Sequence, residues 1–238
     1  MNGRRGFLKA GALLAAAPLM PMMAIGEPGM PMMAMGESGM PVMAIGEPGP
    51  LSMTGTDPVN DLYIIGPRDG YSPQIGTLVS MMNYLRDAVV RSVKGLTVEQ
   101  LDFLLDDKAN TIGALLFHLC ATDAFYHEHT FKGLEWGKWD ESVTKKFGVA
   151  MELGDKGRSE IKGHNLDFYL DLLKETREST FAEFRKRDDK WLATYDKAWE
   201  CNTYWKWFHV CEHESHHQGQ IAFLKSRIPG VKAPAEGS

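Results

Sequence analysis

Hydrophobic residues recur at steps of three or four along most of the chain after Ser72. This spacing places them on one face of an α-helix, and no segment shows the alternation that is typical of a β-strand. Four such runs are each about twenty residues long, the length of the helices in a bundle. They cover residues 73–94, 111–130, 166–187 and 202–227, and a Pro-Gly pair follows the last run. The pattern therefore predicts an all-α fold, a four-helix bundle.

Two other segments connect the predicted helices. Thr97 and Gln100 have the spacing of a capping box, so we expect a short helix that continues to Leu105. Residues 132–163 contain many glycines and charged residues and few periodic positions. We expect a long loop there, between the second and third helices of the bundle, and such loops often serve as lids or walls of binding sites.

The first residues have the layout of an export signal. Arg4 and Arg5 begin the basic string RRGFLK, and an apolar run follows from Ala10 to Met23. The string resembles a twin-arginine signal, through which the twin-arginine export machinery moves folded proteins across a bacterial inner membrane. The apolar run is short and contains proline, so a permanent membrane span is not expected. We expect residues 1–26 to be this signal and the mature protein to be periplasmic or extracellular.

A ten-residue repeat follows, as MPMMAIGEPG, MPMMAMGESG and MPVMAIGEPG. Each unit is too short to form a supersecondary element, so residues 20–60 are predicted to be a flexible linker. A trap for a soft metal ion such as Cu(I) is an alternative interpretation of the methionines. The folded domain is expected at residues 61–232, with a flexible tail at residues 233–238.

The length and composition fit one ordinary domain with additional segments. Hydrophobic residues make up 44% of the 238 residues, which supports a hydrophobic core. The net charge of −5 comes without a basic stripe, so a nucleic-acid-binding role is not expected. Three cysteines are too few for a disulfide scaffold.

Four of the eight histidines fall within nine residues of the last predicted helix. Each residue advances about 100° around a helix, so His209, His213, His216 and His217 lie on one face together with Gln220. The same face continues into apolar residues, and we expect it to point inward. An unpartnered polar group on a buried face costs roughly 1–3 kcal/mol. Several imidazoles there indicate a shared partner, and a divalent metal ion is the simplest one.

A third ligand is expected from a different helix. His213 and His217 are one turn apart, which allows two imidazoles to bind one ion. His118 lies among apolar residues in ALLFHLCATDAFY, within the second predicted helix. Such a histidine is usually a hydrogen-bonded core residue, but the pair on another inward face makes it a candidate ligand. His127 and His129 lie roughly 14–17 Å further along the axis and are expected at a solvated helix end.

The two segments together resemble the DinB-like (YfiT-like) family of bacterial four-helix metalloproteins. ALLFHLCATDAFY matches the apolar second helix with its histidine, and HVCEHESHHQGQIAFLKSRIPG matches H-x-x-x-H followed by Gln-Gly-Gln. The resemblance covers about residues 72–230. It implies that His118, His213 and His217 are the three metal ligands.

Other polar residues of the stripe are candidates for the surroundings of the ion. We expect His209 and His216 to line the pocket, with replacement of an assigned ligand as the alternative. Glu212 lies one turn before His216 and is a candidate to accept an imidazole N–H, the usual task of a residue that orients a metal ligand. Gln220 faces the same way. Ordinary helix polarity is the alternative for both Glu212 and Gln220.

The sequence HESHH also satisfies the H-E-x-x-H motif of zinc proteases, in which Glu214 would be the general base. Only 21 residues follow His217, and they contain no histidine and a single acidic residue, Glu236. Gln220 stands where the extended form of that motif requires glycine. No accompanying sheet is predicted. A metalloprotease is therefore the less favoured alternative.

Three neutral imidazoles leave a divalent ion with an open position for water or a thiolate. All-nitrogen ligation suits Zn, Ni or Fe(II) and does not select among them. We expect a metal-dependent enzyme with a small-molecule substrate, either a hydrolase or a transferase. The resemblance adds a low-molecular-weight thiol as a possible cosubstrate. The alternatives are a non-catalytic metal-binding bundle or a bundle without metal, and a homodimer is possible.

Overall fold

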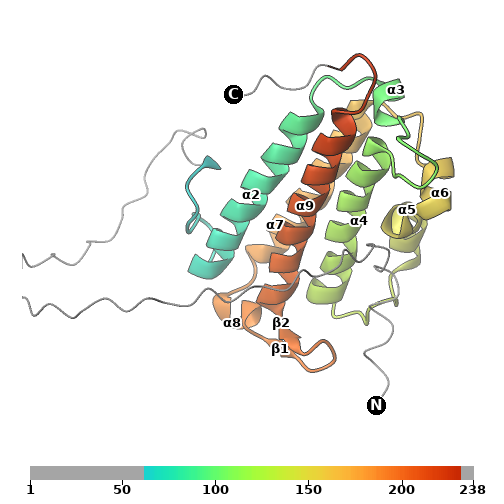
Figure 1. Cartoon of the computed structure of the whole chain (residues 1–238). Coiled ribbons are helices and arrows are strands. Elements are labelled where there is room, and N and C mark those ends of the chain that lie inside the picture. The colour runs from blue at the N-terminus through green and yellow to red at the C-terminus, as the bar shows by residue number, and fades with distance from the viewer. Residues whose placement is uncertain (1–61, 232–238) are drawn as a thin grey trace, which may run out of the picture. The chain divides into compact units, whose positions relative to one another are not determined.

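The computed structural model describes residues 62–231, and this part of the chain confirms the predicted all-α fold. The predicted export signal, the repeats and the tail at residues 233–238 lie outside the described residues. No helix of the described part is both long and apolar enough to cross a membrane. The four long helices are α2 (Pro73–Val93), α4 (Ile112–Phe131), α7 (Leu166–Phe184) and α9 (Thr203–Lys225), as Figure 1 shows.

α4 is the central helix of the bundle. It packs against α7 on one side and against α9 on another, while α2 packs mainly against α9. Most of its residues are buried, including two acidic ones, Asp123 and Glu128. A helix that is apolar nearly all round must be covered on every side, which requires a further element beside α4.

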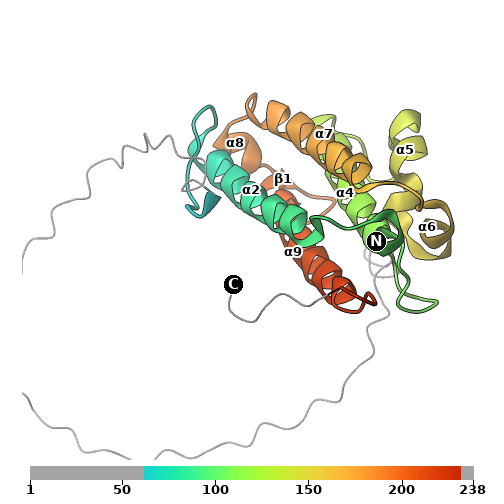
Figure 2. The same cartoon turned by 90° about the horizontal axis from the view of Figure 1, so that it is seen from above.

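That further element lies where the sequence predicts a loop. Residues 132–163 contain α5 (Glu141–Glu152) and α6 (Gly154–Glu160), so the prediction of a long loop there is wrong. α5 packs against α4 and buries Phe147 and Ala150. Figure 2 shows α5 and α6 on the side of α4 away from α2. Val143, Phe147 and Ala150 do have helical spacing, but glycines and charges around them hide it.

Side chains set the beginnings of the helices. Thr111, Asn165 and Asn202 cap α4, α7 and α9, and each accepts a hydrogen bond from the backbone N–H three residues later. The capping box of Thr97 and Gln100 is confirmed, although its helix α3 (Val98–Leu101) ends earlier than predicted.

The connection between α7 and α9 contains elements that the sequence does not predict. It holds α8 (Asp189–Leu192) and a hairpin of β1 (Tyr195–Asp196) with β2 (Cys201–Asn202). The strands pair antiparallel, with Tyr195 opposite Asn202. Strands of two residues are too short for alternation to be visible, which explains why the prediction of no strand is wrong here.

Candidate metal centre

α4 and α9 bring the three predicted ligands together. One nitrogen from each of His118, His213 and His217 lies within 4.8 Å of the other two, and no other such group of three or more possible metal ligands occurs in residues 62–231. His118 Nε2 is 2.9 Å from His213 Nε2. The ring centroids of His213 and His217 are 4.4 Å apart, as expected for residues one turn apart on α9. The convergence required by the sequence analysis is therefore present.

Hydrogen bonds to the opposite ring nitrogens orient two of these imidazoles. His118 Nδ1 is 2.8 Å from the carbonyl oxygen of Ala150 in α5. A carbonyl can only accept, so His118 Nδ1 carries the proton and Nε2 presents a lone pair. His217 Nδ1 is 2.8 Å from Gln220 Oε1, which has the same effect on His217. Residues that orient metal-bound histidines make this kind of contact.

The third imidazole has a different neighbour. His213 Nε2 is 3.3 Å from the hydroxyl of Thr122, which itself donates to the His118 carbonyl oxygen one turn earlier on α4. Thr122 therefore links the backbone of α4 at His118 to the side chain of His213 in α9.

Burial keeps these imidazoles neutral. It lowers the pKa of His118 from 6.5 to about 4, and His217 acts in the same direction. Burial, with His118 as the next cause, lowers the pKa of His213 to about 2. The pKa of His217 is lowered as well, mainly by burial. Neutral imidazoles are the form that binds metal, so no proton has to leave before an ion binds near pH 7.

The donor set fits a small divalent cation. A tetrahedral ion with nitrogen ligands at about 2.0–2.1 Å separates those nitrogens by about 3.3 Å. Here His118 Nε2 and His213 Nε2 are 2.9 Å apart, and all three nitrogens lie within 4.8 Å of one another, so small side-chain rotations suffice. Three imidazoles supply three of four tetrahedral positions.

The other predicted residues surround this cluster without joining it. His209 Nδ1 is 3.3 Å from Glu212 Oε2, and its ring stacks on Trp205. Glu212 was predicted as a candidate partner of His216, but the imidazole it contacts is that of His209. His216 and Gln220 are exposed, so the expectation that the whole stripe points inward is wrong for them. Gln220 still reaches back to His217.

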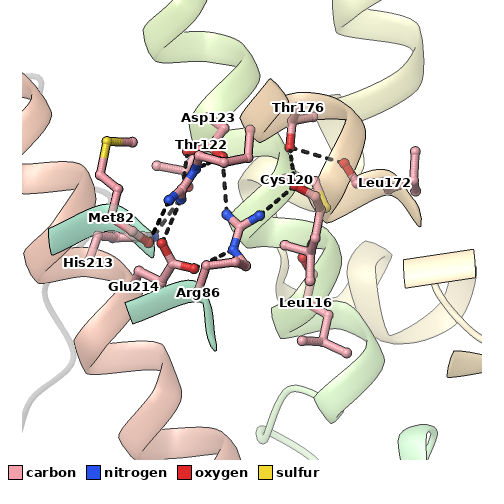
Figure 3. A network of polar contacts seen from close by, with 12 residues as sticks. Met82, Arg86, Leu116, Cys120, Thr122, Asp123, Leu172, Thr176, His213 and Glu214 are labelled. Carbon is pink, nitrogen blue, oxygen red and sulfur yellow. Dashed lines mark hydrogen bonds and ion pairs between the residues drawn. The ribbon is translucent and has the colours of Figure 1, made fainter. Parts of the chain in front are cut away.

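Glu214 belongs to a separate buried network of charges. Its carboxylate is 2.5 Å from Arg86 Nε and 2.6 Å from Arg177 Nη2, and Asp123 contacts the same two arginines. Figure 3 shows Arg86 between Glu214 and Asp123. Both carboxylates are 1% exposed. Glu214 is therefore occupied by two guanidinium groups, which removes the base that the H-E-x-x-H metalloprotease alternative requires.

Each of the four long helices contributes one residue to this network. Arg86 comes from α2, Asp123 from α4, Arg177 from α7 and Glu214 from α9. Asp123 follows Thr122, and Glu214 follows His213, so the network lies directly beside the histidine cluster. Sequence reasoning missed it, although an acidic residue in the apolar α4 was a signal, because a buried charge requires a partner.

The end of α4 differs from its predicted solvated state. His129 Nδ1 donates to the carbonyl of Leu134, and Nε2 accepts from Lys206 Nζ at 2.7 Å. Lys206 also donates to Asp196 in β1, and the His129 side chain is only 9% exposed. His129 thus joins α4 to α9 and the hairpin, away from the histidine cluster.

Comparison with known families identifies the family of the folded domain. The sequence model of the mycothiol-S-transferase family matches residues 77–230, which include all three histidines of the cluster. The chain belongs to the mycothiol-S-transferase family. This family is DinB/YfiT-like and generally binds a divalent metal. No curated protein matches the chain. Family membership and the histidine cluster agree with the resemblance stated above.

Proposed function

We propose that the protein is a divalent-metal-dependent transferase that joins a low-molecular-weight thiol, such as mycothiol, to an electrophilic small molecule. The observation that carries this proposal is the convergence of His118, His213 and His217 in a chain of the mycothiol-S-transferase family. The ligand types suit Zn, Ni or Fe(II).

The chain's own residues prepare the site for this chemistry. His118 and His217 present Nε2 because Ala150 and Gln220 accept their Nδ1 protons. When bound, the divalent ion would lower the pKa of a thiol and stabilise the thiolate. In the transfer, the S–H proton goes to solvent, a C–S bond forms, and the electrophile's leaving group departs with the electron pair of the broken bond.

An open ligand position favours an enzyme over a closed structural site. A non-catalytic site would use His209 or His216 as the fourth ligand. His209 instead contacts Glu212, and His216 is exposed, so neither joins the cluster. A hydrolase that activates water at the same position remains the alternative reaction.

The location of the protein is a separate proposal, which bears on the choice between transferase and hydrolase. Arg4 and Arg5 support export through the twin-arginine machinery, a route that suits a protein loaded with metal before it crosses the membrane. Small thiols are scarce outside the cytoplasm, so export would favour the hydrolase. Fractionation of cells that express the full chain, beside an Arg4→Lys/Arg5→Lys variant, tests this. Export of both proteins, or of neither, would refute the signal.

Metal content and thiol conjugation test the function. We expect the untagged full chain to contain one equivalent of a divalent metal and to consume mycothiol in the presence of a fluorogenic electrophile. His118→Ala should lose both properties. His216→Ala is the matched control and should keep both, since His216 is exposed and outside the cluster. Metal-dependent turnover that is independent of thiol would identify the hydrolase instead, and equal metal content in both variants would contradict the site.

A further inference from the structure

α5 and α6 meet at a single residue with an unusual backbone. Leu153 has φ 55° and ψ −133° between Glu152, the last residue of α5, and Gly154, the first of α6. These angles are close to those of the first central residue of a type II′ turn, a position that favours glycine. A leucine there is strained. Strained residues persist where the surroundings over-determine them, and they cluster at functional sites.

The break at Leu153 leaves the last carbonyls of α5 without their helical partners, and that of Ala150 is one of them. In a continuous helix, Ala150 O would accept a hydrogen bond from the N–H of Gly154, four residues later. The described backbone includes bonds from Leu153 N–H to Val149 O and from Gly157 N–H to Leu153 O, but none from Gly154 to Ala150. Ala150 O is instead 2.8 Å from His118 Nδ1. The interruption thus makes available the acceptor that His118 uses.

No side chain within the described residues offers His118 Nδ1 an alternative hydrogen bond. The nearby hydroxyl of Thr122 donates to the His118 carbonyl oxygen, not to its ring. The other ring nitrogen of His118 faces His213 Nε2. The tautomer that presents Nε2 to the ion therefore depends on the carbonyl from α5.

We infer that the break at Leu153 is a positioning device for His118, which it holds as an Nε2 metal ligand through the carbonyl of Ala150. Leu153 and Gly154 contact neither the ion nor the substrate in this role; they act through α5. The inference rests on the metal site of the proposed function. It explains why the α5–α6 segment is broken next to the histidine cluster.

Substitution of Gly154 tests the inference. Gly154 has φ +65°, and a Cβ there would meet no atom within 4 Å, so alanine is disfavoured only by the backbone conformation at the break. We expect Gly154→Ala to favour a continuous helix, to lower Zn²⁺ affinity about 10- to 100-fold, and to change the His118 tautomer in ¹⁵N NMR of the metal-free protein. Gly154→Asn should retain most of the Zn²⁺ affinity of the unsubstituted protein, since asparagine tolerates positive φ.

Gly148→Ala is the matched control. Gly148 lies within α5, and a Cβ there would contact only Thr144 Cγ2 at 3.7 Å. The Zn²⁺ affinity and the His118 tautomer of the Gly148→Ala variant should equal those of the unsubstituted protein.

The readouts separate the inference from the proposed function. If the unsubstituted protein binds no Zn²⁺, the metal site itself is wrong. If it binds Zn²⁺ and Gly154→Ala binds equally well with the same tautomer, the break has no positioning role. An Nε2-protonated His118 in the metal-free unsubstituted protein would also overturn the inference, even if Gly154→Ala did not fold.

Discussion

Burial and backbone contacts determine the state of each histidine in the cluster. His118 is 7% exposed, and its ring is hydrogen-bonded to the carbonyl of Ala150 and faces the imidazoles of His213 and His217. No carboxylate of residues 62–231 is hydrogen-bonded to any of the three rings. Without an anionic partner, the rings are stable only as neutral groups, and this neutral state is suited to an ion that supplies the positive charge itself.

The pKa values of these histidines predict how the metal-free protein responds to acid. An unfolded histidine titrates near 6.5, whereas burial lowers the pKa of folded His118 to about 4. Between these values the unfolded chain binds more protons, so stability is complete above about pH 6.5 and falls as the pH drops. Each such imidazole contributes up to about 1.4 kcal/mol per pH unit in that window. Urea unfolding at pH 7.0, 6.0 and 5.0 measures this loss.

A variant isolates the histidine contribution from that of other groups. His118→Gln removes one titrating ring, so its unfolding free energy should fall less steeply between pH 6.5 and pH 5. His216→Ala should keep the full slope, because His216 is exposed. Parallel slopes in all three proteins would show that the cluster does not titrate as its burial requires.

Sequence spacing was sufficient to find the three histidines but not their partners. The i,i+4 spacing of His213 and His217 and the apolar neighbours of His118 can be seen in the sequence alone. The carbonyl of Ala150 is not, because every residue has a carbonyl and only tertiary packing selects one. Gln220 was found because it lies on the same helix as its partner.

At the level of elements, helices with a sustained apolar periodicity were predictable from the sequence. Helices whose periodicity is short or interrupted were not. α2, α4, α7 and α9 show sustained periodicity, and their predicted bounds differ from the observed bounds by at most three residues. α5 has a short apolar stripe interrupted by Gly148, and its covering role follows only once α4 is known to be buried all round. The element that was missed supplies the acceptor for His118.

The packing of α4 against α7 depends on a glycine. A Cβ at Gly113 would lie 2.6 Å from Tyr169 Oη and 2.9 Å from Cζ, so Gly113→Ala must separate the helices or displace the ring. We expect a loss of about 1–3 kcal/mol in unfolding free energy. Gly219→Ala is the control on α9, where a Cβ meets nothing within 4 Å. It should gain up to about 1 kcal/mol, because alanine favours a helix. Chemical denaturation of both variants checks the opposite signs.

At the level of the whole described domain, four charges join the four long helices. Arg86, Asp123, Arg177 and Glu214 carry two positive and two negative charges, and Arg177 also donates to the carbonyl of Met82. Burial of such a network has a large desolvation cost, and its benefit is often a unique arrangement of the elements. Here that arrangement is the rotation of α9 relative to α4, which directs His213 and His217 toward His118. No sequence pattern reveals this pairing, since its members are 37 to 128 residues apart.

Neutralising one member of this network should destabilise the whole domain. Glu214→Gln keeps the shape of the side chain but leaves Arg86 and Arg177 with a single buried carboxylate, Asp123. Breaking a buried ion pair from one side costs about 3–5 kcal/mol. Glu175→Gln is the matched control, because its pair with Lys146 is exposed and such pairs contribute about 0–1 kcal/mol. Equal unfolding midpoints in urea for the two variants would contradict a structural role for the network. A large loss confined to Glu214→Gln would show that the helices bearing the histidines are fixed by charges adjacent to the site.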